Sequence, residues 1–400
     1  MPFRPRVGDI VELDETGGSA LEFLEHPMAP GMPYGSQGSR GIVFQVRELP
    51  YGRLSALKVF KPAYQSESTV RSQALMSRYR QLPGLTVWQR QVFTERTNPH
   101  LLRRFPDLRY AVLMPWITGM TWSSIILSQH NLPEQQCEAL ARHFIDLMRV
   151  LELNRLAHCD ITGGNLIIVS GQNAKVELVD VEDMYAPELT KPEHPPGGSE
   201  GYNHQLSAKG IWEPAADRFA SAVLAVEMLV WWEEGLRRVS SREHLFEASE
   251  MQARGSKYEQ VNRTLRDRYG REIAELFEAA WFSDRLEACP SLTDWAEAFQ
   301  RRGLGAEAAL EPMVLPPPAA PKVHPVTGDS VSLNSAAGGQ SAPWKRDGES
   351  LAGEHPATES RESRKAGVLL PADGIYALLV LMTLIGLVMA YFLIARLVTR

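Results

Sequence analysis

The 400-residue sequence is poor in cysteine and has almost no excess of either charge. Its three cysteines, Cys137, Cys159 and Cys289, are an odd number and form no C-x-x-C pair. This pattern argues against a disulfide framework or a zinc ribbon and fits a reducing compartment. Lys and Arg number 42 against 48 Asp and Glu, which gives a net charge of −6. Because no basic excess marks the chain, we expect no nucleic-acid partner.

The N-terminal residues 1–13 also lack an apolar run, so they do not predict a signal peptide. What the chain does have is length and an apolar fraction of 44%. Both suit a large two-lobed domain or two domains with a sizeable core.

An uncharged stretch of 21 residues, 375–395, lies near the C-terminus. At ~1.5 Å per residue a helix of this length spans about 31 Å, the thickness of a bilayer core. We therefore expect a single-pass C-terminal transmembrane anchor, with a buried core helix as the alternative. Residues 306–374, which precede it, contain many Pro, Gly and Ser and no apolar periodicity. They predict a disordered linker.

A glycine-rich segment, residues 34–46, leads into an alternating β-branched run and predicts a hairpin. Glycines in such a turn let backbone N–H groups approach phosphate oxygens, although most glycine-rich hairpins are only turns. The next strand-like run, residues 54–60, carries Lys58 in its middle. Lys58 is either a charge on an edge strand or an ammonium group directed into a cleft.

A second polar segment follows a helix predicted over residues 133–153. Asp160 is followed five residues later by Asn165 and then by an apolar strand, and a further strand, residues 176–180, ends in Asp180. Carboxylate and amide oxygens at strand ends suit Mg²⁺, a hard cation that shares its ligands with phosphate.

In this order and spacing the motifs resemble the protein-kinase superfamily over about residues 35–295. The matches are Ser36, Gly38, Gly41 and Val43 to the glycine loop G-x-G-x-x-G-x-V, Ala56-Leu57-Lys58 to A-x-K, His158-Cys159-Asp160 with Asn165 to H-R-D-x-x-x-x-N, Asp180-Val181-Glu182 to D-F-G, and Asp217 to the buried Asp that opens the large C-lobe helix. The acidic residue and M-Y-x-P after Asp180 are similar to a bacterial kinase-like group.

The resemblance implies an α+β, two-lobed fold with an N-lobe at residues 8–118 and a C-lobe at 119–305. It also implies ATP and Mg²⁺ as ligands. Lys58 would hold the α- and β-phosphates, Asn165 and Asp180 would ligate Mg²⁺, and Asp160 would orient the substrate hydroxyl and take its proton. The implied nucleotide-binding residues are Ser36, Gly38, Gly41, Val43, Lys58, Met114, Pro115, Ile117, Asn165 and Asp180.

Residues 110–119 match the strand and hinge of the family, with Met114 as gatekeeper. Adenine would require a carbonyl from the next residue and an N–H two residues further on. Pro115 lacks an N–H but keeps its carbonyl, and Ile117 can donate. The proline therefore does not block ATP.

Several positions depart from the family pattern. Cys159 replaces the Arg that receives a loop phosphate, so we expect no phosphorylation switch and interpret Cys159 as a small buried filler. Thr162 replaces a Lys of Ser/Thr kinases. Glu182 replaces a glycine, where it could support Mg²⁺, face solvent or pair with an Arg. The helix Glu that should pair with Lys58 falls near Gln73, and Glu67 is the nearest acid.

These observations predict a membrane-tethered Ser/Thr protein kinase that transfers the γ-phosphate of ATP to a protein. Because ATP is intracellular, the folded domain of the protein would face the cytoplasm. Two alternatives stay open: a pseudokinase-type nucleotide-binding scaffold at the membrane, and a small-molecule phosphotransferase with a kinase fold. The sequence does not identify the protein substrate.

Overall fold

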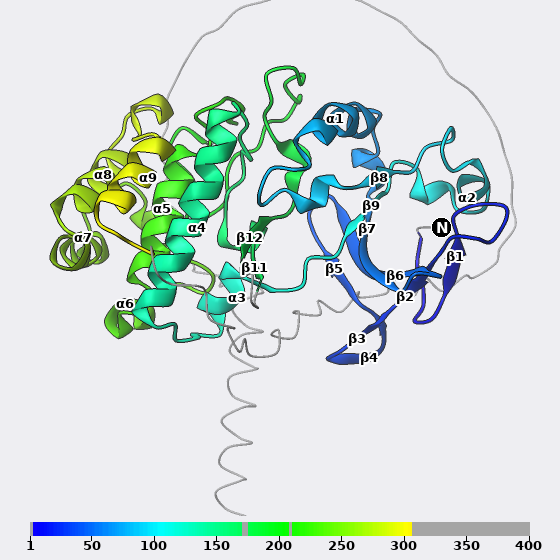
Figure 1. The fold of residues 1–400 in the computed structure, drawn as a ribbon, viewed down its shortest axis with the longest axis horizontal. Coiled ribbons are helices and arrows are strands. Elements are labelled where there is room, and N and C mark those ends of the chain that lie inside the picture. Colours follow the sequence, from blue (N-terminus) through cyan, green and yellow to red (C-terminus); the bar gives the residue numbers. More distant parts are fainter. Residues whose placement is uncertain (1–2, 170–174, 208–209, 306–400) are drawn as a thin grey trace, which may run out of the picture. The chain divides into compact units, whose positions relative to one another are not determined.

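The structure, a computed structural model, describes residues 3–169, 175–207 and 210–305, which form an α+β protein (Figure 1). A curled antiparallel sheet occupies the N-terminal part, and a helical part follows. The expected linker, 306–374, and the expected transmembrane helix, 375–395, lie outside the described residues. Within the described ranges, no helix has both the length and the apolar character needed to cross a bilayer.

The main sheet has the strand order β1-β2-β6-β7-β9-β8, and β5 pairs with β6. Its strands are β1 (Ile10–Glu12), β2 (Ala20–Phe23), β5 (Gly35–Gln37), β6 (Gly41–Leu49), β7 (Arg53–Phe60), β8 (Gln91–Val92) and β9 (Val112–Pro115). A small hairpin of β3 (Glu25–His26) and β4 (Ala29–Pro33) is inserted between β2 and β5. Since β7 lies between β6 and β9, the edge-strand interpretation of Lys58 is wrong.

The period of two along β7 separates its side chains onto two faces. Leu57 faces a core formed within the sheet part, whereas Ala56 and Phe60 join the larger core that continues into the helices. Lys58 shares the parity of Ala56 and Phe60, so the strand directs it toward the helical part. Phe3 packs on Phe23 in the sheet core, with ring centroids 5.7 Å apart. The folded part therefore begins before residue 8, earlier than the sequence predicted.

Two helices accompany the sheet, α1 (Ser68–Met76) and α2 (Pro99–Arg104). The helical part contains α3 (Trp122–Leu127), α4 (Glu134–Leu153), α5 (Arg218–Val230), α6 (Glu234–Arg238), α7 (Ser256–Tyr269), α8 (Arg271–Trp281) and α9 (Leu292–Arg301). A three-stranded sheet of β10 (Met120–Thr121), β11 (Leu166–Val169) and β12 (Lys175–Leu178) lies beside α4. The predicted helix at 133–153 and the predicted strands before Asp180 are confirmed.

The α4 and α5 helices form the centre of the helical part (Figure 1). Apolar residues of α4 recur at helical spacing, and Leu140, Phe144, Met148 and Leu151 are fully buried. The α5 helix is buried along almost its whole length, which explains its nearly uninterrupted apolar sequence. Truncating a core residue such as Phe144 to Ala would cost about 3–5 kcal/mol. This rigid pair supports the polar loop that follows α4.

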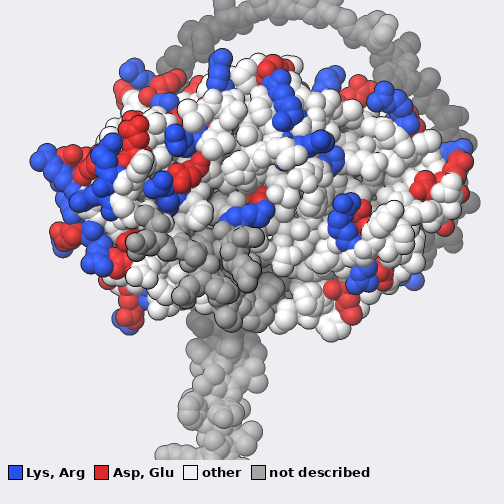
Figure 2. Space-filling view, in the orientation of Figure 1, with Lys and Arg blue, Asp and Glu red and all other residues white. Residues whose placement is uncertain are grey.

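Charged side chains lie mixed on the described part of the face shown in Figure 2. Lys and Arg alternate with Asp and Glu over both the sheet part and the helical part. This mixture matches the small net charge of the sequence.

Candidate functional site

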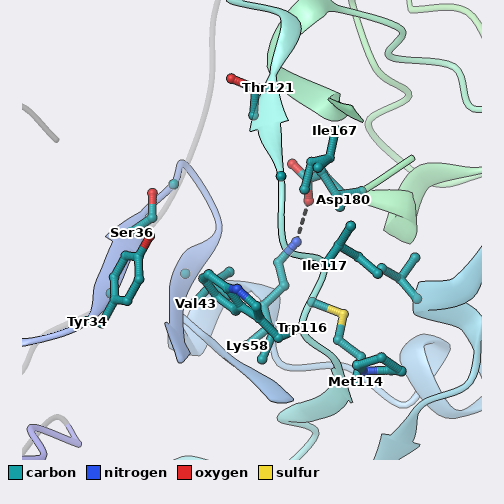
Figure 3. Close-up of a pocket in the computed structure, with 18 of the residues that line it drawn as sticks. Tyr34, Ser36, Val43, Lys58, Met114, Trp116, Ile117, Thr121, Ile167 and Asp180 are labelled. Carbon is teal, nitrogen blue, oxygen red and sulfur yellow. Dashed lines mark hydrogen bonds and ion pairs between the residues drawn. The ribbon is translucent and has the colours of Figure 1, made fainter. Parts of the chain in front are cut away.

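A cavity of about 440 Å³ opens between the curled sheet and the helical part (Figure 3). It is lined by the β5–β6 hairpin, by Lys58 on β7, by the end of β9 and the segment after it, and by Ile167 and Asp180 of the helical part. Nine residues proposed from the sequence line this cavity: Ser36, Gly38, Gly41, Val43, Lys58, Met114, Pro115, Ile117 and Asp180. Asp160 and Asn165 are not among the lining residues.

The glycine-rich segment forms the predicted hairpin, in which Ser36 pairs with Val43. Its turn is closed by the Gly38 N–H, which donates to the Gly41 carbonyl over 2.8 Å. A Cβ on Gly41 would lie 2.2 Å from the Val59 carbonyl oxygen, so close pairing with β7 requires glycine there. By contrast, a Cβ on Gly38 would meet no atom nearer than 3.9 Å. Of these two glycines, Gly41 is therefore the one that the strand pairing requires.

Lys58 points from β7 toward Asp180 (Figure 3) and is almost fully buried. Its ammonium group contacts the carboxylates of both Asp180 and Glu182, with 2.6 Å between Nζ and Glu182 Oε2. Burial alone would lower the pKa of Lys58, but the two carboxylates outweigh it and raise the pKa above its ordinary value. Lys58 is therefore a fixed positive charge at the inner end of the cavity.

The two carboxylates beside Lys58 differ in their access to solvent. The side chain of Asp180 is 49% exposed, whereas that of Glu182 is 11% exposed. Asp180 adopts a left-handed backbone conformation (φ 60°) where the chain turns after β12. Burial and the charge of Glu182 raise the pKa of Asp180 despite the attraction of Lys58. Burial also opposes ionisation of Glu182, but Lys58 and Arg90 together hold its pKa well below the ordinary value.

Glu182 also contacts Arg90, which lies next to Gln73, the position where the kinase pattern would have a glutamate. Its second oxygen accepts a hydrogen bond from Arg90 over 2.8 Å, and Arg90 donates to Gln73 on α1 over 2.9 Å. Gln73 therefore reaches Arg90, and Glu67 is exposed at the start of α1. Of the interpretations of Glu182, pairing with an Arg is confirmed and a solvent-facing side chain is wrong.

The loop after α4 is held in place by the buried Asp217, the residue before α5. Its two oxygens accept hydrogen bonds from the backbone N–H groups of His158 and Cys159, over 2.5 and 2.8 Å. Cys159 has a φ of 66°, an unfavourable conformation for a side-chain-bearing residue that these bonds maintain. Burial raises the pKa of the Cys159 thiol, and the prediction of a small buried filler is confirmed.

Asn165 connects this loop to the strand that leads to Asp180. Its side-chain N–H donates to the Asp160 carbonyl over 2.9 Å, and its own carbonyl accepts from the Val179 N–H over 3.0 Å. The amide nitrogen of the side chain is thus engaged, so only the side-chain oxygen of Asn165 could act as a ligand. Thr162, in contrast, caps the short turn Gly163–Asn165 by accepting from Gly164 and Asn165.

Three contacts at the site were not predicted from the sequence. Ser199 donates from its hydroxyl to Asp160 Oδ1 over 2.8 Å. Arg40, in the turn of the glycine-rich hairpin, donates to Asp183 Oδ1 over 2.6 Å and so joins the sheet part to the helical part. Tyr34 stacks obliquely on Trp116 at the cavity, with centroids 5.3 Å apart. Sequence spacing carries no signal for such long-range pairs.

The donor set fits Mg²⁺ only in company with phosphate. Within residues 3–169, 175–207 and 210–305, no three His, Cys, Asp or Glu side chains gather to hold a metal by themselves. Asp180, which lines the cavity, and Asn165, which does not, would each offer one hard oxygen, and Mg²⁺ commonly binds one or two protein oxygens together with substrate phosphates and water. No protein-family model matches the chain. No curated protein sequence matches it either.

Proposed function

We propose that the protein is an ATP-dependent Ser/Thr protein kinase whose folded part adopts a two-lobed, protein-kinase-like arrangement. The proposal depends mainly on one observation, the contact between Lys58 and Asp180 in a cavity that a glycine-rich hairpin lines. A buried ammonium group beside a half-exposed carboxylate suits a phosphate chain and its cation. The cavity volume of about 440 Å³ lies within the range of small-molecule sites.

Each residue of the site has a role in this proposal. Met114, Pro115 and Ile117 flank the base, while Lys58 binds the α- and β-phosphates. Asp180 and Asn165 hold Mg²⁺, which supplies neutralisation of phosphate charge. Asp160 accepts the proton of the attacking Ser or Thr hydroxyl, a contribution of roughly 10²–10⁴-fold in rate. The absence of a Lys at Thr162 leaves Lys58 as the main cationic group toward the phosphates.

A nucleotide-binding scaffold without catalysis is the second candidate. It is favoured by two contacts of this structure: Lys58 is already paired with two carboxylates, and Ser199 engages Asp160. In the kinase, Asp180 would have to exchange Lys58 for the cation, while the contacts of Glu182 and Ser199 would persist. A small-molecule phosphotransferase would use the same residues, and its product would be a phosphorylated metabolite rather than a phosphoprotein.

Labelled ATP separates these functions. Residues 1–310 are incubated with γ-labelled ATP and Mg²⁺, with Asp160→Asn as the matched inactive variant. Label on protein that depends on Asp160 supports the kinase. Label on a small molecule supports the phosphotransferase, and nucleotide binding without any transfer supports the scaffold. Absence of nucleotide binding contradicts all three functions.

We also propose that residues 375–395 tether the kinase to a membrane from the cytoplasmic side. This proposal depends on the sequence of residues outside the described part. Deletion of 375–400 should release a soluble domain that still binds nucleotide. Retention of the truncated protein in the membrane fraction would contradict the tether.

A further inference from the structure

Glu182 is a second anionic partner of Lys58, and the proposed reaction assigns no role to Glu182. The Lys58 Nζ atom lies 2.6 Å from Glu182 Oε2 and also contacts Asp180. Asp180 is half-exposed at the cavity, so it can turn toward a bound cation. Glu182 is buried and is not a lining residue of the cavity. Only one of the two acids is therefore placed to bind a ligand.

Glu182 is fixed from its other side by Arg90. The two carboxylate oxygens are divided between the two cations: Oε2 faces Lys58, and Oε1 accepts from Arg90 over 2.8 Å. Arg90 is itself immobilised, because its guanidinium lies 3.7 Å from the centroid of the Trp88 ring and donates to Gln73. Gln73 in return donates to the Arg90 carbonyl over 3.0 Å. A chain of contacts thus runs from α1 through Arg90 and Glu182 to Lys58.

We propose that Glu182 is a positioning residue that keeps the Lys58 ammonium group in the cavity and frees Asp180 for the metal. The proposal rests on the proposed function. Lys58 and a divalent cation both attract the Asp180 carboxylate, so they compete for it. A second carboxylate that cannot leave Lys58 weakens this competition. Glu182 thereby takes the place of a glutamate on α1, where Gln73 stands.

Substitution of Glu182 by Gln tests this role through the metal requirement. In Glu182→Gln, Asp180 becomes the single anionic partner of Lys58 among the described residues. The Mg²⁺ concentration that gives half-maximal ATP binding should rise about tenfold, the effect of one charge-assisted contact. For the same reason kcat should fall more than about tenfold while KM for ATP changes less than about threefold.

Glu177→Gln is the matched control. Glu177 is buried, with a side chain 1% exposed against 11% for Glu182, and it lies outside the cavity. It pairs with Lys175 and accepts hydrogen bonds from the Thr86 N–H and hydroxyl over 3.1 and 2.8 Å. Its substitution removes a buried carboxylate without touching Lys58. The Mg²⁺ requirement should stay at the wild-type value, even if the melting temperature falls.

A second variant and a second readout keep the proposal testable if Glu182→Gln does not fold. Glu182→Gln leaves Arg90 without its anion, whereas the double variant Arg90→Met with Glu182→Gln removes one buried cation and one buried anion together. In both variants Lys58 has lost the Glu182 carboxylate, so its amine should react faster with trinitrobenzenesulfonate than in wild type. Peptide mapping measures this reaction without nucleotide or metal. This labelling needs no catalysis, so it tests Glu182 even if the wild type transfers no phosphate.

The outcomes are distinct for the two proposals. A wild-type protein that binds no nucleotide contradicts the proposed function, and faster labelling in the variants would still support Glu182 as the holder of Lys58. An unchanged Mg²⁺ requirement and unchanged labelling in the folded variants would overturn the inference alone. Equal changes in Glu177→Gln would overturn it as well, because they would reveal a general effect of lost buried charge.

Discussion

The hydroxyl of Ser199 donates a hydrogen bond to Oδ1 of Asp160 over 2.8 Å. The two residues come from different segments of the helical part, 39 positions apart in the chain. Asp160 lies in the loop held by Asp217, and Ser199 follows Gly198, whose φ of 72° shapes the turn. One oxygen of Asp160 is thus oriented by Ser199, and in the proposed reaction the other would accept from the substrate hydroxyl.

Ser199→Ala should lower the rate of phosphoryl transfer about tenfold, because a hydrogen bond to a charged acceptor contributes about 1.5–3 kcal/mol to holding its geometry. The KM for ATP should not change, since Ser199 does not line the cavity. Steady-state kinetics with the protein that accepts label from ATP gives both values. Ser199→Thr, which keeps the hydroxyl, is the control and should retain most of the rate. A faster Ser199→Ala enzyme would mean that Ser199 competes with the substrate for Asp160.

Nucleotide binding should depend on Mg²⁺ and on Asp180. Asp180→Ala removes the half-exposed carboxylate at the cavity, so the affinity for ATP in the presence of Mg²⁺ should fall more than about tenfold. Calorimetry with and without EDTA measures this. The control Asp146→Asn removes an acid of α4 that pairs with Arg142 and does not line the cavity, and this variant should bind as wild type. An ATP affinity that neither EDTA nor Asp180→Ala changes would contradict the metal assignment.

The fold was predictable where local periodicity is strong. The helical spacing of α4 and the alternation around Lys58 on β7 reflect burial of one face, which a single segment encodes. The β3–β4 hairpin was not predicted, because Pro27, Pro30 and Pro33 oppose a strand assignment. The hairpin nevertheless forms beside the cavity, which Pro27 lines.

The site was predictable where a motif combines residue type with spacing, as for Lys58 and Asp180. The partner of Lys58 was not, because the contact between Lys58 and Glu182 joins residues 124 positions apart and depends on how the sheet part meets the helical part. A signal was nevertheless present: a carboxylate is missing at Gln73 and an additional one stands at Glu182. Relative to the proposed kinase pattern, the carboxylate stands on a different element, and the sequence alone does not connect the two positions.

The loop that carries Asp160 should depend on the charge of Asp217. Asp217→Asn turns one of its two acceptors into an N–H₂ group that faces a backbone N–H in a buried site. We expect the free energy of unfolding to fall by about 1–3 kcal/mol, the cost of a buried unpaired donor. Urea unfolding measures this change. The control Asp294→Asn alters an exposed cap of α9 and should cost less than about 1 kcal/mol. Equal losses in the two variants would show that Asp217 is an ordinary helix cap.

Glu227 on α5 should make stability depend on pH. It is fully buried and has no cationic partner among the residues that the structure describes. It accepts hydrogen bonds from Trp122 Nε1 over 2.6 Å, from the Tyr202 hydroxyl over 2.7 Å and from the Leu245 N–H. Burial outweighs these donors and raises the pKa of Glu227 from 4.5 to about 7. The folded protein therefore keeps a proton that the unfolded chain has lost between pH 4.5 and 7. Stability from this group is fully present below the unfolded pKa and declines as pH rises through that window, by about 3 kcal/mol in total.

Urea unfolding at pH 5, 6, 7 and 8 should show this decline in wild type and a flatter profile in Glu227→Gln, which cannot ionise. Parallel profiles would mean that Glu227 is already ionised at pH 5, with its three donors sufficient to stabilise the charge.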